Sequence, residues 1–204
     1  MAEVDWVTVG AGFVGALIGG GATLLGVRWQ LRSAAMEQAD KERRQKLAIL
    51  KAIQSELEQL WSIYMDGVGN VIATHPDGQA FHYYWPAYSN YFTVYSSNAA
   101  FVGHLENDAL RKAIVRVYTM AKGAIDSFRM NNGLEERFSN LNAMAHRDPN
   151  PVNQELARAA SKMMEDYAAT LKAVHADLLG AWTEAFDQLQ AAVDNDQTPS
   201  PMTA

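Results

Sequence analysis

The alternation of apolar and polar positions divides the chain into one long apolar run followed by a series of amphipathic segments. The run covers residues 7–27 and holds neither a charged residue nor a proline over its 21 positions. A helix needs about 20 such residues to cross roughly 30 Å of hydrocarbon. The pattern therefore predicts a single transmembrane helix at 7–27, preceded by a short extracytoplasmic tail at 1–6.

The composition in and around the apolar run separates this interpretation from two alternatives, a cleaved signal peptide and a buried helix of a soluble domain. A signal peptide begins with basic residues, whereas Glu3 and Asp5 make the tail acidic. The run and its seven glycines would form a poor helix in water, at about 0.5–1 kcal/mol of destabilisation per glycine. Glycine is frequent in membrane helices, so we expect a membrane anchor.

Basic residues follow the run but do not precede it, and this asymmetry predicts an orientation. Arg28 and Arg32 come directly after the run, where we expect them to contact lipid headgroups. Lys and Arg are retained on the cytoplasmic side of a membrane. The prediction is a single-pass protein of the inner (cytoplasmic) membrane, with its N-terminus outside and its C-terminal domain in the cytoplasm.

Small residues recur at every third or fourth position of the run, at Gly15, Gly19, Ala22 and Gly26. A stripe of this kind lets two membrane helices approach closely. We therefore expect a homo-oligomer in which these residues form the packing face of the membrane helix. A span that is merely rich in glycine is the alternative, because the pattern permits association without requiring it.

The rest of the chain follows the period of helices. Residues 28–46 are rich in basic side chains, and residues 33–46 are polar nearly all round, which predicts a basic helical stalk at 28–46. Apolar residues then recur with helical spacing across 47–194, and an antiparallel bundle is the simplest way to bury their stripes. The tail at 195–204 is polar and is expected to be disordered. The predicted fold is all-α: a transmembrane helix that continues into a stalk, then an antiparallel helical bundle with a long aromatic loop.

Glycine, asparagine and proline mark the expected ends of the bundle helices. We expect the first bundle helix to stop at 66–70 and a later one to end at 131–133, where asparagine and glycine are adjacent. A turn at 146–151 then precedes the final long helix, and Pro151 suits the first position of that helix.

An aromatic segment interrupts the helical pattern. Eight of the chain's 20 aromatic residues lie between 81 and 95, in a region that glycine and proline punctuate. A loop of this length in a compact domain is usually functional or packed by its own side chains. Three interpretations remain open: a plug that closes one end of the bundle, a recognition surface for a protein, and a pocket for a small ligand. The candidate interface residues are Tyr83, Tyr84, Trp85, Tyr88, Tyr91 and Tyr95.

The titratable residues show no pattern of a catalytic or metal site. The chain has no cysteine, and its five histidines lack the spacing of a zinc-binding helix. Carboxylates such as Glu56 and Glu165 match a solvated helix face better than a di-iron site. The net charge is −6, and the part after Lys51 is acidic, which argues against nucleic acid as a partner. We therefore predict no catalytic residue, no cofactor and no metal, in a protein that is not an enzyme.

Two short stretches resemble a known group of proteins. Residues 91–105 (YFTVYSSNAAFVGHL) and 114–118 (IVRVY) are similar to a segment of small bacterial membrane proteins with one N-terminal span and a helical cytoplasmic domain. The resemblance implies a bacterial inner-membrane setting. It implies no activity, because that group has none assigned, and it supplies no catalytic residue.

These features together predict a membrane-anchored interaction or scaffold protein. It would self-associate through its glycine-rich span and present its aromatic segment to an unidentified protein partner. The alternative is a sensory or regulatory bundle that binds a small ligand within 81–95, and an unrecognised enzyme is a third hypothesis. An exposed aromatic patch would favour a protein partner, and a concave pocket would favour a ligand.

Overall fold

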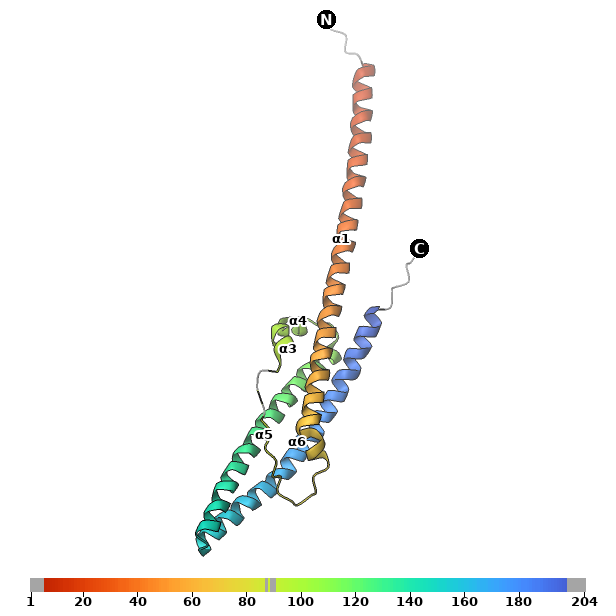
Figure 1. Ribbon diagram of the computed structural model, residues 1–204. Helices are drawn as coiled ribbons and strands as arrows, with labels where there is room; N and C mark the ends of the chain where they lie inside the picture. The colour runs from red at the N-terminus through yellow and green to blue at the C-terminus, as the bar shows by residue number, and fades with distance from the viewer. Residues whose placement is uncertain (1–5, 87, 89–90, 198–204) are drawn as a thin grey trace. The chain divides into compact units, whose positions relative to one another are not determined.

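The computed structural model describes the backbone of residues 6–86, 88 and 91–197, and the side chains of this part from residue 26 to residue 196 (Figure 1). Contacts between residues divide the chain into two compact units, Met1–Ala48 and Ile49–Ala204. Every regular element in the described residues is a helix, and no strand occurs among them. The all-α prediction is therefore confirmed.

Helix α1 (Trp6–Tyr64) begins in the first unit and ends in the second. The side chains described in its first part, from 26 to 42, are all exposed, and Trp29 keeps 78% of its surface accessible. Lys41 pairs with Glu37 one turn earlier, at 2.9 Å, an arrangement that favours a solvated helix. The described side chains of this stretch are therefore open to solvent all round, apolar ones such as Trp29 and Met36 included, and the stalk predicted for 28–46 stays a prediction.

The predicted single-pass location in the inner membrane is wrong. Over the residues that the structure describes, no helix is both long enough and apolar enough to cross a membrane. Helix α1 is 59 residues long, but length alone does not suffice, because a span needs about 20 predominantly apolar residues in succession. Its described side chains instead include Arg28 and Arg32, which are exposed.

The predicted packing stripe falls mostly on residues whose side chains are not described. Gly15, Gly19 and Ala22 lie outside the described side chains, so the association expected through them stays a prediction. Gly26 is described, and a Cβ added there would have no neighbouring atom within 4 Å.

The second unit consists of the end of α1 and six further elements, of which α5 and α6 are by far the longest. Helices α5 and α6 pack along one another and run in opposite directions, joined by a short turn at 148–150 (Figure 1). The short elements and the aromatic segment connect α1 to α5. In chain order the elements are η1 (Met65–Gly69), α2 (Asn70–Ala73), α3 (Thr93–Ser97), α4 (Ala99–Gly103), α5 (Asp108–Arg147) and α6 (Pro151–Gln197).

Local capping explains where the two long helices begin. The Asn107 side chain accepts a hydrogen bond from the N–H of Leu110 at 3.1 Å, as an N-cap does. Helix α6 begins at Pro151, where the missing N–H of proline has no effect on the helix. The side chain of Asn150 accepts from the N–H of Asn153 at 2.9 Å.

The structure continues as helix at both places where the sequence predicts a break. Met65–Gly69 forms one turn of π-helix, and α2 continues the path to Ala73. Helix α5 passes through 131–133 without interruption. Asparagine ends a helix when its side chain bonds the local backbone, but Asn131 and Asn132 bond the backbone of the aromatic segment instead. Tertiary contacts therefore override the local signal.

One apolar core holds the elements of the second unit together. Its fully buried residues include Phe128 of α5 and Leu171 of α6, together with Phe81 of the aromatic segment. Helix α1 ends on this core, with Tyr64 only 6% exposed. The remaining members are Val68, Ile72, Ala124, Ala168 and Leu178.

Candidate functional site

An apolar pocket lies within the second unit, between the end of α1, the aromatic segment, α5 and α6. Its cavity volume is about 60 Å³, and it is partly open to solvent. Six of the thirteen residues that line it are aromatic, and none carries a charge. The lining residues are Leu57, Leu60, Trp61, Ile63, Tyr64, Trp85, Tyr91, Phe92, Val117, Ala121, Ile125, Leu178 and Trp182.

A stack of aromatic rings forms the wall that α1 and α6 share. The ring centroids of Trp61 and Trp182 are 4.8 Å apart with planes 18° from parallel. Phe186 continues the stack on Trp182 at 5.1 Å. Stacked aromatic pairs of this kind stabilise the packing beyond the area that they bury. The indole nitrogen of Trp182 is buried and has no hydrogen-bond partner among the described residues.

A buried polar pair lies beside this wall. The hydroxyl of Tyr64 is 2.8 Å from Nδ1 of His175, and the two rings stack. Burial raises the pKa of the Tyr64 phenol above its ordinary value. The same burial lowers the pKa of the His175 imidazole below its usual range. Both groups therefore stay neutral near pH 7, as an apolar site requires.

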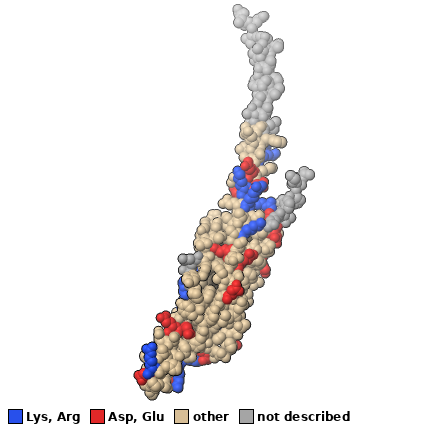
Figure 2. Space-filling view, viewed as in Figure 1, with Lys and Arg blue, Asp and Glu red and all other residues tan. Residues whose placement is uncertain are grey.

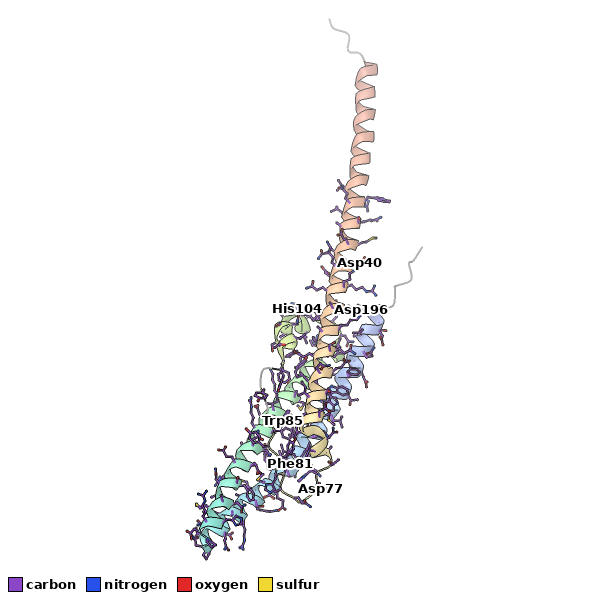
Figure 3. The ribbon with its side chains drawn as sticks, viewed as in Figure 1. Asp40, Asp77, Phe81, Trp85, His104 and Asp196 are labelled. Atoms are coloured by element: carbon purple, nitrogen blue, oxygen red, sulfur yellow. The ribbon has the colours of Figure 1, made fainter. Side chains whose placement is uncertain are left out.

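Two asparagines of α5 hold the aromatic segment in place. The side chain of Asn132 accepts from the N–H of Trp85 at 3.1 Å and donates to its carbonyl at 2.6 Å. Asn131, which is fully buried, donates to the carbonyl of Tyr83 at 3.0 Å. Together they satisfy backbone groups that the segment would otherwise bury unpaired. Trp85, which Figure 3 labels, is thereby fixed against Tyr64 and Phe128.

The π-helical turn makes room for Trp85. A Cβ added at Gly67 would lie 2.7 Å from Nε1 of Trp85, so only glycine allows this approach. The hydroxyl of Tyr83 donates to the carbonyl of Gly67 at 2.8 Å. π-Turns occur frequently at functional sites. Here the turn and the aromatic segment fit each other directly beside the pocket.

Glu56 fixes the other end of the aromatic segment. Its carboxylate accepts from the N–H of Val94 at 2.7 Å and from the N–H of Tyr95 at 3.0 Å, at the start of α3. It also accepts from the hydroxyl of Tyr118 at 2.7 Å. A carboxylate at a helix N-terminus satisfies unpaired N–H groups and complements the helix dipole. The interpretation of Glu56 as part of a solvated face missed this role.

The structure divides the predicted interface residues into three groups. Trp85 and Tyr91 line the pocket. Tyr83 and Tyr95 are half-buried, and the ring of Tyr95 stacks on that of Tyr118. Tyr84 and Tyr88 are exposed, at 65% and 62%. The segment is therefore partly a packed element and partly a surface, whereas the sequence left the plug, the surface and the pocket as alternatives.

The pocket wall offers apolar surface and aromatic faces, and its polar side chains are two tyrosines and three tryptophans. None of the thirteen lining residues is a carboxylate, a histidine or a lysine. Among the residues that the structure describes, no three His, Asp or Glu side chains converge as metal ligands would. The arrangement is suited to binding an apolar molecule.

Comparisons with known proteins do not assign the chain to a family. No family model, no curated protein and no solved structure matches it.

Because His175 is buried, we expect the free energy of unfolding to depend on pH. In the unfolded chain His175 binds a proton below about pH 6.5, whereas the depressed pKa of the folded imidazole delays protonation to lower pH. Its contribution to stability is therefore complete above about pH 6.5 and is lost as the pH falls toward the folded pKa. We expect His175→Gln to flatten this decline in urea unfolding curves measured between about pH 7 and pH 5. His146→Gln, at an exposed position, should keep the wild-type slope; equal slopes in all three proteins would contradict the prediction.

Proposed function

We propose that the second unit is a ligand-binding module that takes a small, neutral, largely aromatic molecule in the pocket between α1, α5, α6 and the aromatic segment. The observation that carries this proposal is the wall itself, with six aromatic rings and no charged group. Ligand sites are typically concave, mostly apolar and formed before the ligand arrives. A sensory or regulatory bundle is the functional class that such a site serves.

Three further features support binding in preference to a purely structural role. The aromatic segment is held at Glu56 on one side and at Asn132 on the other, so the wall does not have to form around a ligand. The absence of charge from the lining residues favours a neutral molecule, because burying an unpaired charge is strongly unfavourable. Uncharged side chains also cover most of the visible face of the second unit (Figure 2).

The exposed part of the aromatic segment favours a second candidate function, contact with a protein partner. Tyr84 and Tyr88 present most of their surface to solvent, and tyrosine is enriched in protein interfaces. In sequence these two residues flank Trp85 and precede Tyr91, which line the pocket. A partner that contacts the exposed tyrosines would lie beside the pocket residues in sequence, and the two candidate functions are compatible.

The test of the primary proposal is a titration of the full chain with naphthalene, followed through the indole N–H signals in NMR spectra. We expect the signals of Trp61, Trp85 and Trp182 to shift, because these indoles line the pocket. The signal of Trp29 should stay unchanged, since that side chain is exposed on the first part of α1. The anionic analogue 2-naphthoate should bind at least about tenfold more weakly, because the wall has no cation to replace its hydration.

A matched pair of variants locates the binding. Ala121→Leu adds bulk to a residue of the pocket wall and should weaken naphthalene binding about tenfold or more, whereas Ala173→Leu adds the same bulk at an exposed position of α6 and should leave it unchanged. The proposal would be refuted if naphthalene shifted none of the indole N–H signals of the three pocket tryptophans. It would also be refuted if naphthalene bound the two variants with equal affinity.

A further inference from the structure

The end of the α5–α6 hairpin that carries the connecting turn leaves its apolar side chains uncovered. There the two helices extend past the other elements of the second unit (Figure 1). We call residues 134–163, all of which the structure describes, the hairpin tip. The tip has seven large apolar residues and none of them is fully buried, while its buried residues are two alanines, Ala157 and Ala160. Two helices alone therefore do not bury the apolar surface of this tip.

The uncovered apolar residues lie on one face of the hairpin tip. Four exposed residues of α6 repeat at intervals of four, three and four positions, so they form one row along the helix. The members of this α6 row are Val152, Leu156, Ala159 and Met163. A groove between the two helices places Leu156 of the row beside Leu141 of α5. Helical spacing places polar residues on the opposite face, among them Ser139, Asn142, Gln154 and Ser161. The tip as a whole is therefore amphipathic, and its apolar face is open to solvent.

Two charged residues of opposite sign border the α6 row on the same edge. Glu155 precedes the central Ala159 by four residues, and Lys162 follows it by three. Their contacts within the chain are exposed ion pairs about one turn away, and pairs of this kind contribute little to stability. If a second copy of α6 lies antiparallel across Ala159, Glu155 of each copy faces Lys162 of the other. The border of the row is therefore complementary in charge to itself.

We propose that the apolar face of the hairpin tip is the contact through which two copies of this chain form a symmetric dimer, with their α6 helices antiparallel and centred on Ala159. Val152 of one copy then packs against Met163 of the other, as apolar rows do in paired helices. Each copy supplies the same surface, so the two ion pairs between Glu155 and Lys162 are equivalent by symmetry. The four helices of the two tips form a bundle that covers the apolar face. This dimer does not depend on the pocket.

The size of the apolar face determines how strong this dimer is expected to be. The face extends about 20 Å along the helices and about 20 Å across the two of them, at a rise of about 1.5 Å per residue and a spacing of about 10 Å between helix axes. An area of roughly 400 Å² per copy is about half that of a standard interface and belongs to the weak, transient class. We therefore expect a Kd on the order of 10–100 µM.

Sedimentation velocity of the full chain, from about 5 µM to about 1 mM, measures this dimerisation. Leu156→Asn puts an amide into the apolar face and should raise the Kd at least about tenfold. Leu179→Asn is the matched control, because Leu179 lies on the same helix outside the tip and is exposed to the same extent, 43% against 42%. It should change the Kd by less than about twofold. A chain that stays monomeric over the whole range, or two variants that associate alike, would overturn the proposal.

An exchange of the two bordering charges tests the antiparallel arrangement. Glu155→Lys and Lys162→Glu each place like charges opposite one another twice per dimer, so each should raise the Kd about fivefold or more. The double variant restores opposite charges between the copies and should return the Kd to within about twofold of wild type. It also keeps the changed contacts of both single variants within each chain, so the recovery reports only on contacts between copies. A double variant that dimerises as weakly as the single variants would show that the helices do not pair in this way.

Discussion

Replacing Phe128 with alanine is expected to lower the free energy of unfolding by about 3–5 kcal/mol, the range for truncating a fully buried phenylalanine. The ring of Phe128 has no exposed surface and lies edge-on to Tyr64, Phe81 and Trp85. These three neighbours come from α1 and the aromatic segment, while Phe128 belongs to α5. Its removal therefore leaves a cavity where all three parts meet.

Urea unfolding followed by circular dichroism measures this loss, provided that the slope with denaturant is the same in both proteins. Met130→Ala is the matched control, because Met130 is on the same helix but 57% exposed. Surface truncations of that kind change stability by about 0.5 kcal/mol or less. A loss below about 1 kcal/mol for Phe128→Ala would mean that the cluster does not hold these elements together.

Glu56→Gln is expected to lower the free energy of unfolding by about 1.5–3 kcal/mol, because hydrogen bonds to a charged acceptor are stronger than neutral ones. The carboxylate accepts from two backbone N–H groups and from the Tyr118 hydroxyl. Glutamine keeps the shape but turns one acceptor atom into a donor, so one of these groups loses its partner. Amide exchange at Val94 and Tyr95 should accelerate, which places the effect at the start of α3.

A neighbouring carboxylate and a double variant complete the experiment on Glu56. Glu58→Gln, at an exposed position two residues later, should leave both stability and amide exchange unchanged. Tyr118→Phe removes the hydroxyl that bonds to Glu56, so the double variant should lose less stability than the sum of the two single variants. Strict additivity would show that Glu56 and Tyr118 act independently and would contradict the proposed network.

The aromatic segment could be predicted from the sequence as a candidate site, but the residues that hold it in place could not. Trp85 and Tyr91 were identifiable because aromatic residues concentrate in a short stretch without helical periodicity. Glu56 gives no such signal. A carboxylate on the polar face of a helix looks the same whether it meets solvent or the start of another helix, because the partner is 38 residues away in the chain.

Two asparagines of α5 are a second case in which long-range partners cannot be read from the local sequence. Next to a glycine, Asn131 and Asn132 predict the end of a helix, and the local chemistry behind that rule is sound. Their amides instead complete the hydrogen bonding of Tyr83 and Trp85, which lie 48 and 47 residues earlier. The all-α class follows from periodicity alone, whereas these long-range partners depend on which elements pack together. The membrane prediction rested on the composition of a single run, and over the described residues no helix is both long enough and apolar enough to cross a membrane.

The π-turn at Met65–Gly69 also determines which insertions and deletions the chain can tolerate. Tyr64, Val68 and Ile72 are all buried at successive intervals of four residues, and in an α-helix each such interval drifts about 40° around the axis. The wider turn absorbs this drift and keeps all three side chains in phase with the core. A single-residue deletion within the turn would restore α-helical winding and leave Ile72 facing the core, whereas a deletion in an α-helical stretch would rotate everything after it by about 100°. Loss of one residue should therefore be tolerated in this turn and at the Gly78 bend, which lies outside the helices, and not within the α-helical part of α1.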